Sequence, residues 1–338
     1  MSAHNGFAAQ ERQMTRGAEV AWREGMDLRN WYPVTASCED GQLVLAWRDM
    51  TDIAFTDSFF HNTLGRQARE QRRVCHTPLS ALQQFDDALA PDAFIFHISR
   101  CGSTLLTQLL ASLPHCIVMS EPPIIDSVLR LHHDLADAGM ASPSTPALLR
   151  QVMLAMGQRR TGAERKFVIK FDCWHIHSIA LLRQAFPDTP CLFLYREPLA
   201  VLASHQRQRG PQMVPGLIHP ALLPLSASAA PPGDLDAYTA QVLQGLLAIA
   251  SEQAQAASIR LVNYRQLPDL LFSELLAALS IDCSDEQRAA MQARSRFHSK
   301  YKDNSYDGDP QAARQDSLIP LAAQLEPAYQ ALENLRLA

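Results

Sequence analysis

The stretch that decides the fold is FIFHISRCGSTLLTQLLASLP, residues 94–114. It begins as an apolar run of the kind found in buried strands, and leucines at helical spacing follow a Ser-Arg-Cys-Gly turn at 99–102. A glycine in a strand-to-helix turn lets the backbone approach a ligand, and the free amides at the start of the helix attract an anion. The stretch therefore predicts an anion-binding loop between a strand and a helix.

Three side chains of this loop carry groups that bind anions. Ser103 and Thr104 offer hydroxyl donors, and Arg100 adds a fixed positive charge with a forked donor geometry. The alternative is that Ser103 and Thr104 only cap a core helix, as these residue types often do. None of the 14 glycines is followed by lysine, so the lysine of triphosphate-binding loops is absent. The loop therefore predicts a less highly charged anion than ATP.

From residue 92 onward, short apolar runs alternate with amphipathic helix patterns. The runs are DAFIFHI, HCIVM, KFVIKF, PCLFLY and SIRLVNY, at 92–98, 115–119, 166–171, 190–195 and 258–264. The helix patterns lie at 102–113, 123–138, 146–158, 175–186, 198–209, 236–257 and 317–336. This alternation predicts an α/β fold of three layers, with a mostly parallel sheet flanked by helices. In such sheets the ligand binds at the carboxyl ends of the strands.

The N-terminal part of the chain has a different pattern. It holds three of the four tryptophans and a strand pattern at 42–48, and a helix pattern at 57–73 follows, with Asp57 or Ser58 as the expected cap. We expect residues 1–88 to form a small α+β accessory subdomain, and residues 89–338 to form the main domain. The Pro-, Ser- and Ala-rich segment 210–234 is expected to be an irregular loop.

Bulk composition excludes several classes of protein. A net charge of −5 gives no electrostatic basis for nucleic-acid binding. No apolar run reaches the roughly 20 residues of a membrane span, and the first residues lack the apolar core of a signal peptide. The seven scattered cysteines contain no Cys-x-x-Cys pair, which favours reduced thiols in a cytoplasm over a disulfide framework or a metal site.

A second loop follows the run PCLFLY. It begins with Arg196 and Glu197, and Ser204 lies eight residues after the arginine. Taken alone, Arg196 would be a surface residue paired with Glu197. Taken together, SRCGSTLL (99–106) and LFLYREPLAVLAS (192–204) resemble the two nucleotide-binding signatures of the sulfotransferase family. This family moves a sulfuryl group from 3′-phosphoadenosine 5′-phosphosulfate (PAPS) to a hydroxyl or an amine.

The resemblance assigns a role to each loop. It implies that the first loop binds the 5′-phosphosulfate through Arg100, Cys101, Gly102, Ser103 and Thr104, with Cys101 contributing only its backbone amide. It further implies that Arg196 and Ser204 bind the 3′-phosphate.

The run SIRLVNYRQLPDLLFSELLAALSI (258–281) extends the resemblance. Tyr264 matches the tyrosine that the family places near the nucleotide, whereas Arg265 and Gln266 replace its usual acidic pair. The layout is closest to the branch of protein-tyrosine sulfotransferases and related bacterial enzymes. The resemblance covers about residues 92–310 and implies a P-loop-like sulfotransferase fold for the domain 89–338.

Sulfuryl transfer needs a base for the acceptor proton and a cation near the leaving oxygen. Glu121, in HCIVMSEPPIID, matches the glutamate of the resembling branch and is the expected base; its alternative is an N-cap or first-turn carboxylate. Lys170, at the end of KFVIKF, and Arg100 are the expected cations, and no metal is needed. Asp172 is a structural partner that Lys170 could have instead. His97 and His115 are weaker candidates for the base.

The segment 293–309 is a polar loop where family members close a basic segment over the nucleotide. Ser299, Lys300 and Lys302 are its candidate ligands, and a solvated loop is the alternative.

The sequence therefore predicts a cytoplasmic, PAPS-dependent sulfotransferase that releases adenosine 3′,5′-bisphosphate. The acceptor is a small molecule, a carbohydrate or a peptide, and homodimer formation is left open. One alternative is a small-molecule kinase of the same fold, which would bind ATP with magnesium. Another is a non-catalytic nucleotide-binding protein that uses its N-terminal subdomain to bind a partner.

Overall fold

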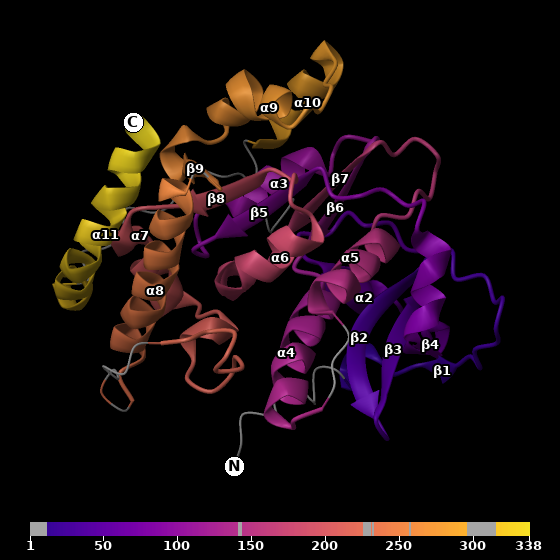
Figure 1. Ribbon diagram of the computed structural model, residues 1–338. Helices are drawn as coiled ribbons and strands as arrows, with labels where there is room; N and C mark the ends of the chain where they lie inside the picture. Colours follow the sequence, from indigo (N-terminus) through magenta and orange to yellow (C-terminus); the bar gives the residue numbers. More distant parts are fainter. Residues whose placement is uncertain (1–11, 141–143, 226–230, 232, 257, 296–315) are drawn as a thin grey trace. The chain divides into compact units, whose positions relative to one another are not determined.

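The computed structural model describes residues 12–140, 144–225, 231, 233–256, 258–295 and 316–338 (Figure 1). The chain forms two compact units, each assembled from separate segments. The first unit comprises residues 1–92, 114–169 and 178–189, and the second comprises 93–113, 170–177 and 190–338.

The main sheet has five strands in the order β6-β7-β5-β8-β9. Its strands are β5 (Ala93–His97), β6 (Cys116–Ser120), β7 (Lys166–Lys170), β8 (Cys191–Tyr195) and β9 (Arg260–Asn263). β8 pairs in parallel with β5 and with β9, and the register places His97 opposite Leu194 and Tyr195 opposite Asn263. Each strand coincides with one of the apolar runs, because strands covered on both faces need apolar side chains on both. The predicted α/β fold is confirmed.

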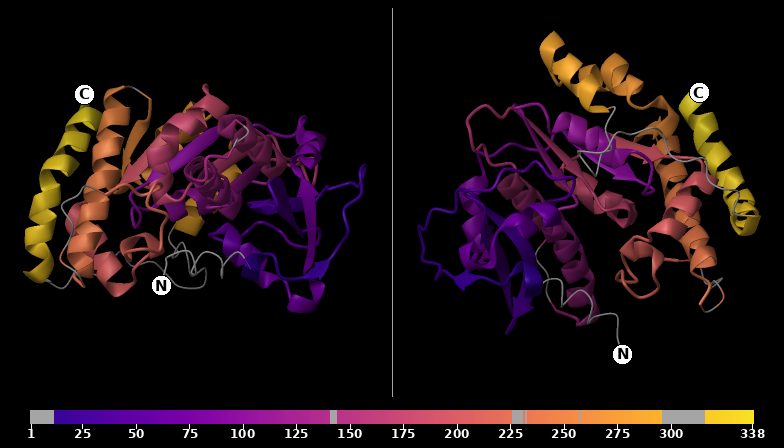
Figure 2. Two further views of the ribbon diagram at one scale, coloured as in Figure 1. Left: turned by 60° about the horizontal axis from the view of Figure 1, so that its bottom comes forward. Right: turned by 180° about the vertical axis from the view of Figure 1, so that it is seen from behind.

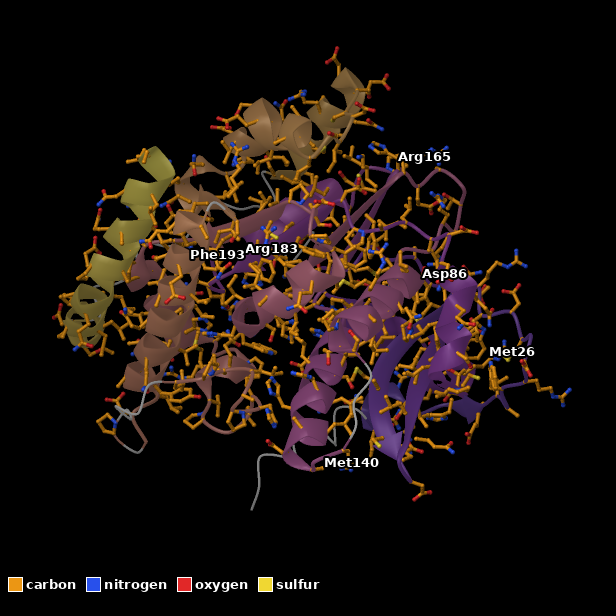
Figure 3. The ribbon with its side chains drawn as sticks, in the orientation of Figure 1. Met26, Asp86, Met140, Arg165, Arg183 and Phe193 are labelled. Carbon is orange, nitrogen blue, oxygen red and sulfur yellow. The ribbon has the colours of Figure 1, made fainter. Side chains whose placement is uncertain are left out.

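Most of the helices also follow the predicted alternation, whereas the helix Asp285–Ser295 was not predicted and includes the first residues of the expected loop 293–309. The helices include α3 (Ser103–Leu110), α4 (Pro123–Asp137), α5 (Thr145–Met156), α6 (Ile179–Ala185), α7 (Pro198–Arg207), α8 (Leu235–Gln255), α9 (Leu276–Ala278), α10 (Asp285–Ser295) and α11 (Ile319–Leu337). A short 3₁₀ helix, Cys173–Ser178, precedes α6. In the second unit α8 and α11 lie side by side (Figures 1 and 2). Phe193, which is labelled in Figure 3, lies in the middle of β8 and is fully buried.

The first unit contains a second, mixed sheet of order β1-β4-β3-β2. Its strands are β1 (Ala18–Glu19), β2 (Trp31–Glu39), β3 (Gln42–Asp49) and β4 (Arg73–Pro78). β3 is the strand predicted at 42–48. β2 was not predicted, since a proline within a run weakens a strand assignment; the pairing with β3 shifts register between Pro33 and Thr35. α4 packs on β2, where the Ser127 hydroxyl bonds both the N–H and the C=O of Ala36 at 2.9 Å.

The helix predicted over 57–73 is shorter than the sequence indicates. α2 spans Phe60–Arg66, its N-cap is Phe59 rather than Asp57 or Ser58, and Arg73 already begins β4. The helix ends because Gln67 turns to an extended conformation. The Gln67 amide then donates to Asp49 O at 2.7 Å and accepts from the buried Arg48. Tertiary hydrogen bonds therefore override a helix-forming sequence.

Arg160 joins several backbone segments of the first unit. Its guanidinium donates to Ile53 O at 2.5 Å, to Met50 O at 2.7 Å and to Thr51 O at 2.9 Å. It also lies over the ring of Phe55, with Cζ 5.2 Å from the ring centroid. Only a planar group with several fixed donors can make this set of contacts.

We expect Arg160→Lys to lower the free energy of unfolding by about 2 kcal/mol, because an ammonium cannot satisfy three carbonyls in these directions. Urea denaturation measures the change. Arg159→Lys is the matched control, since Arg159 is exposed and makes a single bond of 3.3 Å to Asp87 O. Equal losses for the two variants would contradict this role of Arg160.

Candidate functional site

Most of the sequence-predicted ligand residues in the second unit lie at the carboxyl ends of strands, whereas Ser204 lies within α7. Arg100 to Thr104 follow β5, Lys170 ends β7, Arg196 follows β8 and Tyr264 follows β9. We call this set, residues 99–104 with Lys170, Arg196 and Tyr264, the candidate anion site. In open parallel sheets this edge is where ligands bind.

The loop after β5 has an uncommon backbone. Ser99 and Arg100 have φ values of 74° and 52°, and Gly102 has a φ of 84°. Left-handed conformations cost energy for residues with a Cβ, and they persist where the surroundings impose them, often at binding sites. The turn brings the start of α3 directly after Gly102, which is its N-cap.

Hydrogen bonds from neighbouring segments fix this loop. Ser99 N donates to His97 Nδ1 at 2.9 Å, so the proton of the neutral ring lies on Nε2, which donates to Phe171 O at 3.1 Å. Cys101 Sγ donates to Leu194 O at 3.1 Å. Both ring nitrogens of His97 are therefore engaged with the backbone, which makes His97 a structural residue and a poor base.

The first turn of α3 presents its amides without a side-chain cap. No side chain of the described residues caps this helix, so neither Ser103 nor Thr104 has the capping role that was the alternative. Both are nonetheless buried. Uncapped N–H groups at a helix N-terminus and adjacent hydroxyls are the donors that a phosphate or sulfate group accepts.

Tyr264 connects the two predicted loops. A Cβ added to Gly102 would lie 2.8 Å from Tyr264 Cδ2, so the ring is packed directly on this glycine. The guanidinium of Arg196 lies over the same ring, with Cζ 4.2 Å from the centroid. This distance is within the range of a cation–π contact. The structure thus brings together Gly102, Tyr264 and Arg196, which belong to three separate sequence motifs.

Lys170 is the buried cation of the site, with 1% of its surface exposed. The next residue, Phe171, donates its N–H to Ile95 O at 3.0 Å, which ties the end of β7 to β5. Burial raises the pKa of the Cys101 thiol to about 11, against the opposing effects of nearby backbone N–H groups and of the charges of Lys170 and Arg196. Both cations thus lie near the loop, and Cys101 remains a neutral thiol.

Arg100 contacts the residue that follows α7, the helix that contains Ser204. Arg100 Nη2 donates to Gln208 O at 2.5 Å, just beyond the helix. Ser204 is part of α7, and its carbonyl accepts from Gln208 N at 3.1 Å. Arg100 therefore contacts the segment that follows the predicted 3′-phosphate ligand in the chain.

Glu121 belongs to the first unit and follows β6 directly. Its φ of 54° is left-handed, which is costly for a residue with a long side chain. Pro122 is the N-cap of α4, and the acidic residue of its first turn is Asp126, so Glu121 is neither the cap nor a first-turn residue. The alternative role considered for Glu121 is therefore excluded. The candidates Ser299, Lys300 and Lys302 lie outside the described residues.

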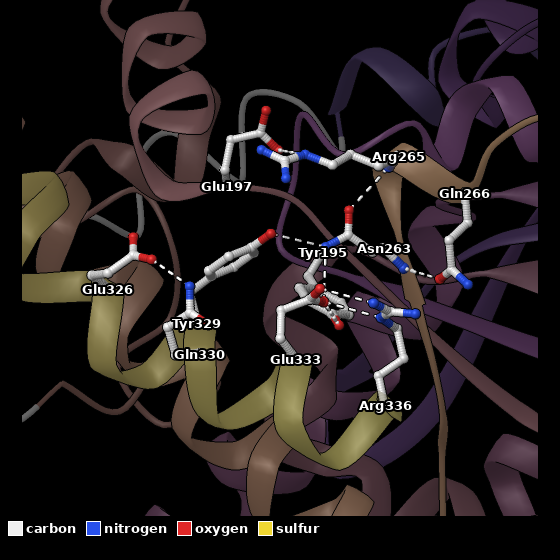
Figure 4. Close-up of polar contacts among 10 residues, drawn as sticks. All are labelled: Tyr195, Glu197, Asn263, Arg265, Gln266, Glu326, Tyr329, Gln330, Glu333 and Arg336. Carbon is white, nitrogen blue, oxygen red and sulfur yellow. Dashed lines mark hydrogen bonds and ion pairs between the residues drawn. The ribbon is translucent and has the colours of Figure 1, made fainter. Parts of the chain in front are cut away.

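A polar cluster beside the site was missed by sequence reasoning. Tyr195 and Asn263, the last residues of β8 and β9, both donate to the carboxylate of Glu333 in α11 (Figure 4). Gln266, one of the two departures from the family pattern, accepts from Asn263 N at 2.9 Å. Arg265, the other departure from the family pattern, faces Glu197, with 3.9 Å between Arg265 Nε and Glu197 Oε2. A lone acid in an amphipathic helix resembles a solvent-exposed residue, so only the structure reveals this role.

This geometry defines an α/β protein whose candidate anion site lies at the carboxyl edge of a parallel sheet, which is the edge where many nucleotide-binding proteins hold their ligand. Residues 91–214 match the model of the sulfotransferase family, and the predicted family is thereby confirmed over this stretch. The match supports sulfotransferase activity in general. Comparison with curated proteins found no match. Within the described part of the chain, no helix combines the length and the hydrophobicity that a membrane span requires.

Among the solved structures that are similar to this chain are three sulfotransferases. Sulfotransferase STF1 from Mycobacterium tuberculosis H37Rv is 17% identical, with a TM-score of 0.41, over 63% of this chain and 74% of its own. Sulfotransferase STF9 from Mycobacterium avium is 12% identical, with a TM-score of 0.44, over 74% and 81%. The sulfotransferase domain of the Synechococcus PCC 7002 olefin synthase is 16% identical, with a TM-score of 0.40, over 71% and 95%.

We expect Gly102→Ala to lower the free energy of unfolding by about 3 kcal/mol, from the left-handed backbone and the contact with Tyr264 together. Gly139→Ala is the control, because Gly139 has a φ of 64° and open space around its Cα. This variant should lower the free energy of unfolding only through the left-handed backbone conformation, by about 1 kcal/mol. Chemical denaturation compares the two. Equal losses in the free energy of unfolding for the two variants would contradict the close packing of Tyr264 on Gly102.

Proposed function

We propose that the protein transfers a sulfuryl group from PAPS to an acceptor hydroxyl or amine. The contact of Tyr264 with both Gly102 and Arg196 is the observation that carries this proposal, because it joins a loop suited to one anionic group to an arginine suited to another. A nucleotide with phosphates at both its 5′ and 3′ positions is a ligand that would use both.

In this proposal the two ends of the nucleotide bind to different elements. The 5′-phosphosulfate accepts hydrogen bonds from the backbone N–H groups of Cys101 to Thr104, and from the Ser103 and Thr104 hydroxyls. Arg196 and Ser204 bind the 3′-phosphate, and Ser299, Lys300 and Lys302 are further candidate ligands of the nucleotide. The absence of a Gly-Lys pair supports this donor over a triphosphate.

The chemical step is an in-line displacement. Glu121 takes the acceptor proton, the acceptor oxygen or nitrogen bonds to sulfur, and the bond from sulfur to the bridging oxygen breaks. The electron pair of that bond stays on the 5′-phosphate of the departing adenosine 3′,5′-bisphosphate. Lys170 and Arg100 offset the negative charge that develops there, which is the main contribution a protein makes to transfers of this type.

The proposal extends to the domains and the setting of the enzyme. Residues 1–88 would form an accessory subdomain that helps to define the acceptor, and residues 89–338 would form the sulfotransferase domain. All seven cysteines are free thiols, which supports a cytoplasmic enzyme. A small molecule, a carbohydrate or a peptide would be the acceptor.

Arg196→Ala should weaken binding of adenosine 3′,5′-bisphosphate by about 10- to 100-fold, since it removes a charge-assisted contact with the 3′-phosphate. The affinity for adenosine 5′-monophosphate, which has no 3′-phosphate, should fall by less than about threefold. Isothermal titration calorimetry without metal measures both. Arg207→Ala, an exposed arginine at the end of α7, is the control and should bind like the wild type. Tighter binding of ATP with magnesium than of the bisphosphate would favour a kinase instead.

Glu121→Gln should lower kcat by about 10²- to 10⁴-fold, the usual contribution of a general base, and leave bisphosphate affinity within about twofold. The assay uses ³⁵S-labelled PAPS and an acceptor found by screening phenols, sugars and tyrosine peptides. Asp137→Asn, exposed at the end of α4, is the control for a lost carboxylate. Full turnover by Glu121→Gln would remove Glu121 from the mechanism.

A further inference from the structure

A single carboxylate connects the carboxyl ends of two neighbouring strands. Tyr195 Oη and Asn263 Nδ2 both donate to Glu333 Oε1, the amide at 2.9 Å. Tyr195 and Asn263 are opposite each other in the parallel register of β8 and β9. Glu333 therefore holds two strands at the same level, at the edge of the sheet where the candidate anion site lies (Figure 4).

The surrounding contacts keep this carboxylate ionised and in place. Arg336 donates to it twice, from Nη2 at 2.9 Å and from Nε at 3.1 Å. Only 18% of the Glu333 side chain is exposed. Burial opposes ionisation, but the hydrogen bonds from Arg336, Tyr195 and Asn263 outweigh it and lower the pKa of Glu333 to about 2. The group is thus a carboxylate at any working pH.

Asn263 is fixed through both polar groups of its side chain and through its backbone N–H. Its Nδ2 also donates to Tyr329 Oη at 3.0 Å, and its Oδ1 accepts from Arg265 N at 2.9 Å. Its own N–H donates to Gln266 Oε1 at 2.9 Å. The backbone therefore has one defined direction as it leaves β9 into Tyr264.

The residues that follow Tyr195 and Asn263 are Arg196 and Tyr264. These two side chains form the cation–π contact of 4.2 Å in the candidate anion site. Because one carboxylate holds the preceding residue of each, it sets how both chains leave the sheet. Positioning of binding groups by the residues behind them is a general requirement of precise sites.

We propose that Glu333 is a positioning residue for the candidate anion site: it holds Arg196 and Tyr264 in the arrangement that receives the 3′-phosphate. Glu333 does not touch the ligand. This inference rests on the proposed function, because the 3′-phosphate is the group that Arg196 would bind there.

A purely structural anchor for α11 would be the simpler role. The helix is already held by buried apolar side chains, among them Leu325 and Leu332. A partly buried ionic network adds little stability over such packing, because removing charges from water is costly. The network instead fixes the positions of Tyr195 and Asn263, the last residues of β8 and β9.

The test is Glu333→Gln, compared with Glu326→Gln on the same helix. Glu326 is exposed and accepts from Gln330 at 2.7 Å, so it controls for loss of an α11 carboxylate. Calorimetry measures the dissociation constants of adenosine 3′,5′-bisphosphate and of adenosine 5′-monophosphate. In Glu333→Gln the bisphosphate should bind about tenfold more weakly and the monophosphate should change less than twofold. Glu326→Gln should match the wild type.

Tyr195→Phe is a second variant, which removes one hydroxyl from the network and keeps the buried ring. Like Glu333→Gln, it should raise the dissociation constant of the bisphosphate relative to that of the monophosphate, here by about threefold. A lower melting temperature of Glu333→Gln with an unchanged ratio would show that Glu333 only anchors α11. Equal weakening of both nucleotides would also overturn the proposal.

A ligand-independent measurement separates this inference from the proposed function. If the wild type bound neither nucleotide, the proposed function would fail, and amide hydrogen exchange would still test the positioning. Glu333→Gln should then raise exchange in peptides covering residues 194–199 and 262–267 by about tenfold relative to Glu326→Gln. Unchanged exchange in these peptides would refute the role of Glu333.

Discussion

The candidate site depends on one aromatic ring that touches two strand ends at once. Tyr264 packs on Gly102 from the loop after β5 and lies under the guanidinium of Arg196 after β8. Because Gly102 has no Cβ, the ring can approach the backbone of the loop directly. A shift of any one of these three residues displaces the other two, so the loops are coupled through packing rather than through chain connectivity.

Hydrogen bonds to backbone carbonyls and to one carboxylate surround this contact. His97 and Cys101 bond Phe171 O and Leu194 O, and Asn263 bonds the carboxylate of Glu333. Buried polar groups that satisfy each other in this way rigidify the part of the fold that contains them. A rigid edge suits a site whose work is to present donors in fixed positions, since no reorganisation is then needed when the ligand binds.

The sequence predicts the fold better than it predicts the site. Buried parallel strands and the helices between them leave strong apolar patterns, so all five main strands were found. β2 was missed because of Pro33, and α2 was overextended because the bonds of Gln67 are tertiary. Local motifs located Gly102, Arg196 and Tyr264. Glu333 leaves no local signal, since its partners Tyr195 and Asn263 are about 140 and 70 residues away.

The thiol in the first loop has a consequence for the chemical durability of the site. Oxidants and alkylating agents attack the thiolate, and a fully buried thiol with a pKa raised to about 11 offers almost none. Cys101 therefore differs from the reactive cysteines that other enzymes place at helix N-termini. Its donation to Leu194 O uses the sulfur as a small neutral contact. The loop can thus carry a cysteine beside two cations without presenting a reactive thiolate.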